Sequence, residues 1–148
     1  MSLDRDKSLT YIVNHVSRQL TQAMNAELKA HGVAPGQFPV LQCLWEQDGL
    51  TQRELYQRIK IEQATMSNTL KRMERDCLIY REPDPSDRRA VRIHLTGMAK
   101  KLEGKLVKGA KAVNKTAFNG IKKKERKLLL DMMSAISANL DTAEAKRD

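Results

Sequence analysis

The chain has 148 residues, enough for one domain with its own hydrophobic core, so stability requires neither disulfides nor a structural metal. It carries 27 lysines and arginines against 18 aspartates and glutamates, and the net charge of +9 makes a polyanion the first partner to consider. No apolar run is long enough for a membrane span, and the isolated cysteines and histidines match no metal site, so we expect a cytoplasmic protein without membrane partner, metal or cofactor.

The first third of the chain has the pattern of two amphipathic helices. Apolar residues recur every three or four positions over residues 8–30, and the turn at Gly32 ends this long helix. The same spacing over residues 38–45 predicts a shorter helix that stops at the turn pair Asp48-Gly49.

The next segment predicts a helix-turn-helix. Thr51 and Glu54 form a capping box, which starts a helix that runs to about Ile59. After a break of three residues, a second short helix extends to about residue 77. Its apolar face consists of Met66, Leu70 and Met73.

The spacing of apolar residues then changes to that of a β-hairpin. Residues 78–82 and 91–95 alternate as two half-buried strands do, and the polar loop 83–90 suits a hairpin tip. Thr96 caps a long helix, and after Gly120 a last helix follows, with its own apolar stripe, to about residue 140. The residues of the long helix that we expect to face inward are Met98, Leu102, Leu106, Ala110, Val113 and Ala117.

These elements predict a mainly α protein with a small β-hairpin wing, as a single domain over residues 1–148. Residues 36–95 form the winged helix-turn-helix, and residues 8–32 and 97–140 supply the remaining helices. The apolar stripes of those helices have no room to be buried on so small a module. We therefore expect them to pack against a second copy in a two-fold homodimer.

The second helix of a helix-turn-helix enters the major groove of DNA, so its outer face is the first candidate for contact. This face carries side chains that can bond to base edges, with cations near the helix end for phosphates. The candidates are Gln63, Thr65, Ser67, Asn68, Lys71 and Arg72. A solvated face without a ligand has a similar composition, and the position of this face in the motif favours DNA.

The hairpin tip and the start of the helix-turn-helix add further candidates. Arg88 and Arg89 can reach phosphates or a narrow minor groove, and Asp87 is expected to orient an arginine side chain before DNA arrives. A salt-bridged surface turn is the alternative. Thr51 and Gln52 are weaker candidates for a phosphate clamp at a helix N-terminus, because the capping box already explains Thr51.

The sequence resembles the MarR (multiple antibiotic resistance regulator) family of bacterial transcription factors over about residues 9–140. The stretches that carry the resemblance are 34–38, 50–55, 73–81, 84–89 and 95–96. It implies that Asp87 and Arg89 form the family's D-x-R pair, with Arg89 as the residue inserted into DNA. Cys77 stands where the family commonly has glycine, and because a side chain is strained at positive φ this argues against a left-handed turn there.

The resemblance also implies control by an effector. In many members a small, often aromatic, anion binds where the dimer helices meet the winged unit. The candidates for such a pocket are Tyr11, His15 and Arg18 on the first helix. The alternative is that these side chains are simply solvated. Some members sense peroxides through a thiol near the N-terminus, where this chain has none. Cys43 is interpreted as a small buried hydrophobe, and thiol sensing stays a minor alternative.

We therefore predict a sequence-specific transcription regulator, and no enzyme, that binds a palindromic double-stranded DNA operator as a ligand-responsive repressor in a bacterial or archaeal cell. A winged helix for protein contact and a non-specific DNA-binding protein are the alternatives. Most of the excess charge lies elsewhere: residues 100–130 hold eleven basic and two acidic groups, whereas residues 51–99 have a net charge of only +3. We expect lysines 105 to 124 to affect association rate and salt sensitivity rather than operator preference.

Overall fold

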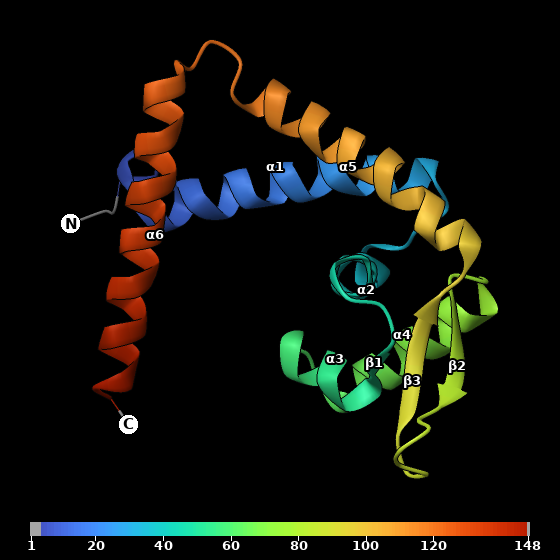
Figure 1. Ribbon diagram of the computed structural model, residues 1–148. Helices are drawn as coiled ribbons and strands as arrows, with labels where there is room; N and C mark the ends of the chain where they lie inside the picture. Colours follow the sequence, from blue (N-terminus) through green and yellow to red (C-terminus); the bar gives the residue numbers. More distant parts are fainter. Residues whose placement is uncertain (1–3, 148) are drawn as a thin grey trace. The chain divides into compact units, whose positions relative to one another are not determined.

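The computed structural model describes residues 4–147, which form two compact units that divide between Val113 and Asn114 (Figure 1). The elements, in chain order, are η1 Arg5–Lys7, α1 Leu9–Ala30, η2 Pro35–Gln37, α2 Phe38–Glu46, β1 Leu50–Thr51, α3 Gln52–Arg58, α4 Gln63–Arg75, β2 Ile79–Pro83, β3 Val91–Leu95, α5 Gly97–Ala117 and α6 Lys123–Ala145. The mainly α architecture with a small wing is as predicted. No helix in the described range is long and apolar enough to cross a membrane.

Local hydrogen bonds define both ends of α1. The Ser8 hydroxyl accepts a hydrogen bond from the Tyr11 amide at 3.4 Å, which caps the N-terminus. At the other end Gly32 has φ +72°, and the amide of Val33 donates to the Leu28 carbonyl at 3.0 Å. The predicted span of this helix is therefore confirmed.

The helix-turn-helix consists of α3 and α4. The Thr51 amide donates to the Glu54 carboxylate at 2.8 Å and the Glu54 amide to the Thr51 hydroxyl at 3.1 Å, so the predicted capping box is present. The predicted apolar face of α4 is also confirmed, since its three residues are almost completely buried. These are Met66, Leu70 and Met73.

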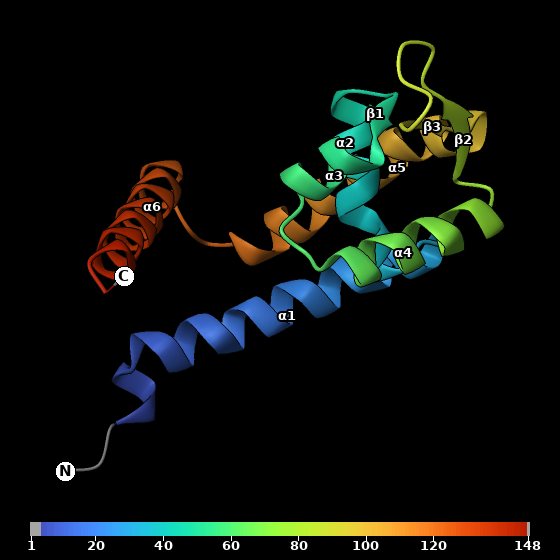
Figure 2. The same ribbon diagram turned by 90° about the horizontal axis from the view of Figure 1, so that it is seen from below.

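The sheet has three antiparallel strands in the order β1-β3-β2, one more than the sequence predicted. Strands β2 and β3 pair from Ile79 with Leu95 to Pro83 with Val91, close to the predicted hairpin, and Figure 2 shows the loop between them projecting beyond the strands. The extra strand, β1, has two residues and pairs Leu50 with Ile93. A two-residue segment is too short to show alternation, so its pairing with β3 is what defines it.

The core of the first unit lies between the sheet and helices α2 to α5, together with the last turn of α1. The largest fully buried side chains are Leu28, Val40, Leu41, Leu44, Leu50, Leu55, Met66, Leu70, Met73, Ile79, Ile93 and Leu106. Every element of the winged helix-turn-helix contributes to this one cluster. The cluster therefore holds α4 and the wing in a fixed relation to each other.

Two inward positions predicted for α5 are wrong. Leu102 and Leu106 are buried as expected, but Met98 is 50% exposed and Ala99 takes its place in the core. The Trp45 indole of α2 donates to the Ala99 carbonyl at 3.0 Å, and the small Ala99 side chain permits this approach. Ala117, at the end of the helix, is also exposed.

The end of α4 has a left-handed residue where the sequence argued against one. Cys77 has φ +59°, the only non-glycine residue with positive φ in the described range. Its amide donates to the Glu74 carbonyl at 3.1 Å, and the Leu78 amide donates to the Met73 carbonyl at 2.9 Å. This pair of bonds is a Schellman motif, whose geometry requires positive φ whatever residue stands there.

Replacing Cys77 with glycine is expected to raise the free energy of unfolding by about 0.5 to 1 kcal/mol. Relief of a left-handed side chain is worth about 1–2 kcal/mol, and the greater freedom of glycine in the unfolded chain offsets part of it. Urea unfolding with an unchanged m-value measures the gain. Cys77→Ala is the control, because it keeps the Cβ atom, and an equal gain there would contradict the explanation.

The second unit consists of the end of α5, the turn at Gly120 and α6. The Arg126 side chain donates to the carbonyls of Ile121 and Phe118 at 2.9 and 3.3 Å and lies 5.3 Å from the centre of the Phe118 ring. These contacts fix the turn. The predicted apolar stripe of α6 is largely exposed within this unit, and its members are Leu128, Leu129, Met132, Met133, Ile136 and Leu140.

Candidate nucleic-acid interface

The outer face of α4 carries six candidate side chains, which we name the recognition face: Gln63, Thr65, Ser67, Asn68, Lys71 and Arg72. Five of them are exposed, and Ser67 is half-buried. They lie opposite the buried side of the helix, so this face is both rigidly supported and open to a partner. Hydroxyl and carboxamide groups occupy its first half and cations its second half, an arrangement that suits bases and phosphates respectively.

Polar contacts also anchor the end of α4. The buried Gln37 amide donates to the Asp76 carboxylate at 2.9 Å, and the Arg75 guanidinium donates to the same group at 3.0 Å. The hydrogen bond from Arg75, followed by that from Gln37, lowers the pKa of Asp76 below its ordinary value. The recognition face is therefore tied at its end to the segment that precedes α2.

The tip of the wing leaves both candidate arginines exposed. Neither Arg88 nor Arg89 takes part in an ion pair among the described residues. The Asp87 carboxylate accepts a hydrogen bond from the Arg89 backbone amide at 2.9 Å, so it stabilises the main chain of the turn instead of a guanidinium. The expected contact with an arginine side chain is thus wrong for the protein without DNA.

An ion pair at the base of the wing joins it to the rest of the unit. Arg92 on β3 lies 2.9 Å from the carboxylate of Asp84, and its other terminal nitrogen donates to the Gly49 carbonyl at 2.8 Å. The Asp84 carboxylate also accepts the Ser86 amide at 2.8 Å. The hydrogen bond from Ser86, and then the charge of Arg92, lower the pKa of Asp84. These contacts connect the tip loop to the turn that precedes β1.

The lowered pKa of Asp84 makes the wing sensitive to acid. Its carboxylate is stabilised in the folded state, so the contribution is fully present above the unfolded pKa of about 3.9 and is lost as the pH falls through the lower folded value. We expect Asp84→Asn to lower the urea midpoint at neutral pH, and we expect the difference from the wild type to shrink below the unfolded pKa of about 3.9 and to vanish only below the lowered folded pKa. A difference that persists unchanged in acid would contradict this origin.

The start of α3 brings the weaker candidates into a network with the wing. The Gln52 side-chain oxygen accepts from Arg81 of β2 at 3.3 Å, and Arg81 in turn donates to Glu74 of α4 at 3.1 Å. This leaves the amide protons of Gln52 available to a phosphate. Thr51 has its hydroxyl engaged in the capping box, which leaves it less free for such a role.

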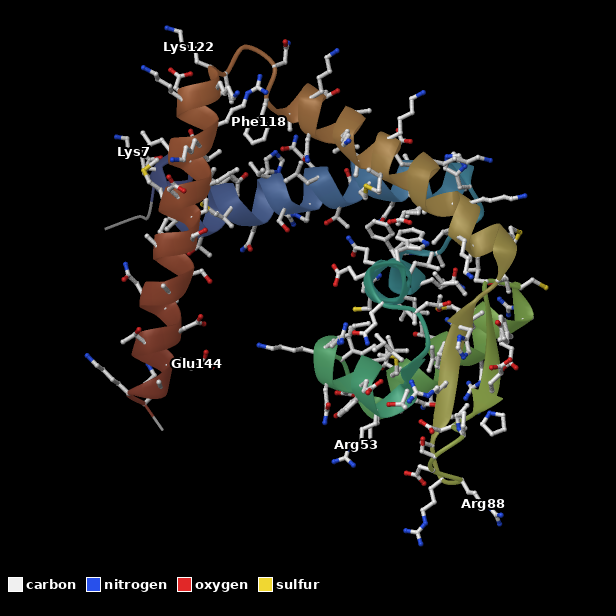
Figure 3. All side chains as sticks on the ribbon, in the orientation of Figure 1. Lys7, Arg53, Arg88, Phe118, Lys122 and Glu144 are labelled. Carbon is white, nitrogen blue, oxygen red and sulfur yellow. The ribbon has the colours of Figure 1, made fainter. Side chains whose placement is uncertain are left out.

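Two exposed residues of α3 were not among the sequence candidates. Arg53 and Tyr56 line a hollow of about 470 Å³ between α3 and α4, which Gln63 and Ser67 of the recognition face also line. Arg53 and Arg88 point to the same side of the first unit (Figure 3). The sequence did contain a signal for them: Arg53 and Tyr56 are three residues apart, which places both side chains on the helix surface away from the buried Leu55.

The three effector candidates, Tyr11, His15 and Arg18, lie on α1 at spacings of four and three residues. The rings of Tyr11 and His15 stack with their centres 6.3 Å apart and their planes 8° from parallel. All three residues, including Arg18, are exposed, and none of them lines the hollow between α3 and α4. The protomer thus stacks Tyr11 on His15, and Arg18 lies about one helical turn further along α1.

The cysteines differ in their surroundings. Cys43 is half-buried on α2, and burial raises the pKa of its thiol above the ordinary value, with Glu46 acting in the same direction. A raised pKa keeps the thiol protonated at neutral pH and makes it a poor nucleophile. Cys77 is exposed at the end of α4.

Known proteins match this chain in sequence and in fold. The profile of the MarR family matches residues 33–91. The HTH-type transcriptional regulator TtmR of Methylorubrum extorquens is 30% identical over 91% of this chain and 68% of its own length. The organic hydroperoxide resistance transcriptional regulator of Bacillus subtilis is 27% identical over 95% of this chain and 92% of its own length. A MarR family regulator from Listeria monocytogenes, solved with a 26mer DNA, is 24% identical with a TM-score of 0.76 over 90% of this chain and 89% of that one, a likeness of fold.

Proposed function

The chain belongs to the MarR family and is a DNA-binding transcription regulator, and from this premise we propose that it represses transcription by binding a palindromic operator as a homodimer. The observation that carries the proposal is the recognition face, which is exposed and polar on a helix whose opposite side is buried in the core. The wing arginines, exposed at the tip of a hairpin, add a second contact at the groove edge.

Exposed apolar residues on the outer helices support the homodimer. On α1 the large apolar side chains Leu9, Ile12, Val16 and Leu20 are between 41 and 54% exposed, and α6 carries its own exposed stripe. Surfaces of this kind are unfavourable in water, and a second copy of the same chain covers them in a two-fold arrangement. Sedimentation equilibrium at micromolar concentration tests this, and a monomer there would contradict it.

The test of operator binding is selection of duplexes from a random pool by the purified protein. A two-fold regulator should select a palindrome whose half-sites are about one helical turn, roughly 10 base pairs, apart. Binding without sequence preference would indicate a general DNA-binding protein, and failure to bind DNA would indicate a winged helix used for protein contact. Either outcome would contradict the proposal.

We further propose that a small aromatic or anionic effector releases the dimer from its operator in the cytoplasm. The stacked rings of Tyr11 and His15 support a contact with an aromatic acid, and Arg18 would provide the charge once a partner protomer completes the site. Operator affinity measured with and without saturating salicylate-like acids tests this class of ligand. The raised pKa of Cys43 argues against thiol sensing at that residue, and Cys77 is the exposed thiol. Replacement of both cysteines by serine tests thiol sensing, with operator binding measured under peroxide.

The relatives are regulators of transcription, and we assign the chain no catalytic role. In this proposal the protein acts through its binding equilibrium with the operator, and an effector shifts that equilibrium by changing the separation of the two recognition helices. A dimer is sensitive to that separation because both helices must meet the same face of the duplex.

A further inference from the structure

The exposed side of α5 carries a row of lysines that the recognition of an operator does not use. Lys100, Lys101, Lys105, Lys108 and Lys111 are all exposed, and we name this row the lysine face. It lies opposite the buried Leu102 and Leu106, and it extends over roughly 16 Å at the helical rise of about 1.5 Å per residue. The helix contains one acidic residue, Glu103.

The charge of the lysine face is not neutralised within the chain. Among the ion pairs of residues 4–147, the face contributes one, between Lys100 and Asp48 at 4.0 Å. Lys101 and Lys105, Lys105 and Lys108, and Lys108 and Lys111 are three or four positions apart, the spacing at which like charges destabilise a helix. A polyanion bound along the face would relieve this repulsion.

A glycine at the centre of the face has no internal explanation. Gly104 lies between the lysines on the exposed side, and a Cβ atom added to it would meet nothing within 4 Å. Glycine within a helix is unfavourable relative to alanine, so packing does not account for it. Its absence of a side chain lets an extended partner approach the helix backbone closely.

The composition of the face indicates which polyanion fits. Protein interfaces depend on buried aromatic and apolar anchors and are depleted in lysine. The exposed side of α5 has the five lysines of the face, no aromatic side chain and two large apolar ones, Met98 and Val107. A membrane-surface helix inserts an apolar side, whereas the apolar side of α5 is already buried against the core. A line of mobile ammonium groups is suited to the evenly spaced phosphates of duplex DNA.

Lys100 at the start of the lysine face pairs with Asp48, two residues before β1, and the remaining lysines lie on the side of α5 away from the helix-turn-helix. The opposite side of α5 contacts α2 through Trp45, and α2 lies between α5 and α3 (Figure 1). We propose that the lysine face is a second DNA-binding surface, which holds the phosphates of a duplex without reading its sequence. It acts independently of operator recognition, because the two surfaces lie on different helices and face different directions.

The proposal is tested by the salt dependence of binding to a random-sequence duplex. Replacing Lys101, Lys105, Lys108 and Lys111 with glutamine should reduce the slope of log affinity against log salt by up to about 3 to 4, since each phosphate contact contributes about 0.9. The affinity of the same variant for a selected operator, relative to random DNA, should be retained or increased. Circular dichroism and thermal melting confirm that the variant is folded.

A matched control removes the same charge from another helix. Replacing Lys122, Lys123, Lys124 and Lys127 with glutamine lowers the net charge equally. The charge pattern of the sequence assigned salt sensitivity to lysines 105 to 124 as a group, whereas a surface confined to α5 predicts that this variant keeps most of the slope. Equal losses in both variants would show an effect of net charge alone and would overturn the proposal, as would an unchanged slope in the α5 variant. Vesicles of phosphatidylcholine and phosphatidylserine test a membrane as the partner. If the wild type bound them more tightly than DNA and the α5 variant lost that binding, the proposal would be overturned in favour of a membrane.

A second readout separates this surface from the proposed operator site. An immobilised operator duplex saturated with protein should capture a labelled random duplex, and the α5 variant should lose this capture while still occupying the operator. If selection yields no operator, a random duplex is immobilised in its place, and capture of the labelled duplex that the α5 variant loses would reject the proposed repressor and leave the second surface standing. Operator occupancy by the wild type with no capture of the labelled duplex would reject the second surface.

Discussion

Arg89→Ala is expected to weaken binding to the selected operator by about ten- to a hundredfold, corresponding to a loss of roughly 1–3 kcal/mol. The Arg89 side chain is exposed at the wing tip and has no ion pair among the described residues, so it is free to enter a narrow minor groove where the negative potential is concentrated. A dimer would lose two such contacts at once. Fluorescence anisotropy at fixed salt, with the selected duplex, measures the change.

The control for Arg89 removes the same charge from another place. Arg147→Ala near the end of the described chain changes the net charge equally and should alter operator affinity less than threefold, a small free energy. Arg89→Lys tests whether the guanidinium group itself is needed, because a lysine ammonium keeps the positive charge but lacks the planar arrangement of hydrogen-bond donors. If Arg89→Ala bound as tightly as the wild type, the wing would not be a DNA contact.

Leu70→Ala is expected to lower the free energy of unfolding by about 2–5 kcal/mol. Leu70 is 0% exposed in the middle of α4, between Met66 and Met73, and the cluster around it includes residues from the sheet and from α2. Truncation leaves a cavity that neighbours held by several elements cannot close. The urea midpoint at fixed protein concentration measures the loss, and operator binding should fail at temperatures where the variant unfolds.

Variants of the same helix separate packing from other effects. Leu70→Met conserves most of the volume and should cost less than about 1.5 kcal/mol. Lys71→Ala, the next residue along, is exposed and should change stability by less than about 0.5 kcal/mol while weakening DNA binding. A loss in Lys71→Ala that equals the loss in Leu70→Ala would contradict the assignment of the two faces of α4.

Local sequence signals predicted the helices, the hairpin and the buried side of α4. Thr51 and Glu54 are three residues apart, so their reciprocal bonds need no distant partner. The recurrence of Met66, Leu70 and Met73 shows the buried side in the same way, and the opposite recognition face follows from it. Features set within one or two helical turns can be read directly from the order of residues.

Features that depend on contacts between distant segments were decided by the tertiary structure. Strand β1 exists because Leu50 pairs with Ile93, and at the start of α5 Ala99 instead of Met98 faces the core, where its carbonyl accepts the Trp45 indole of α2. Asp84 and Arg92 form their ion pair across the base of the wing. Each of these contacts joins residues at least eight positions apart, and no local propensity specifies them.

The sequence by itself determined the net charge, the order of the elements and the exposed polar face of α4, because each follows from composition or from short-range periodicity. The tertiary structure decided that Cys77 adopts a left-handed conformation, that Asp87 bonds to main chain, and that Arg53 lies on the same side as the wing tip. The first two rest on local hydrogen bonds, the Schellman motif that ends α4 and the bond from the Arg89 amide to Asp87, which the residue types at those positions did not indicate. The third follows from the packing of distant elements into one core, which fixes the direction of α3 relative to the wing.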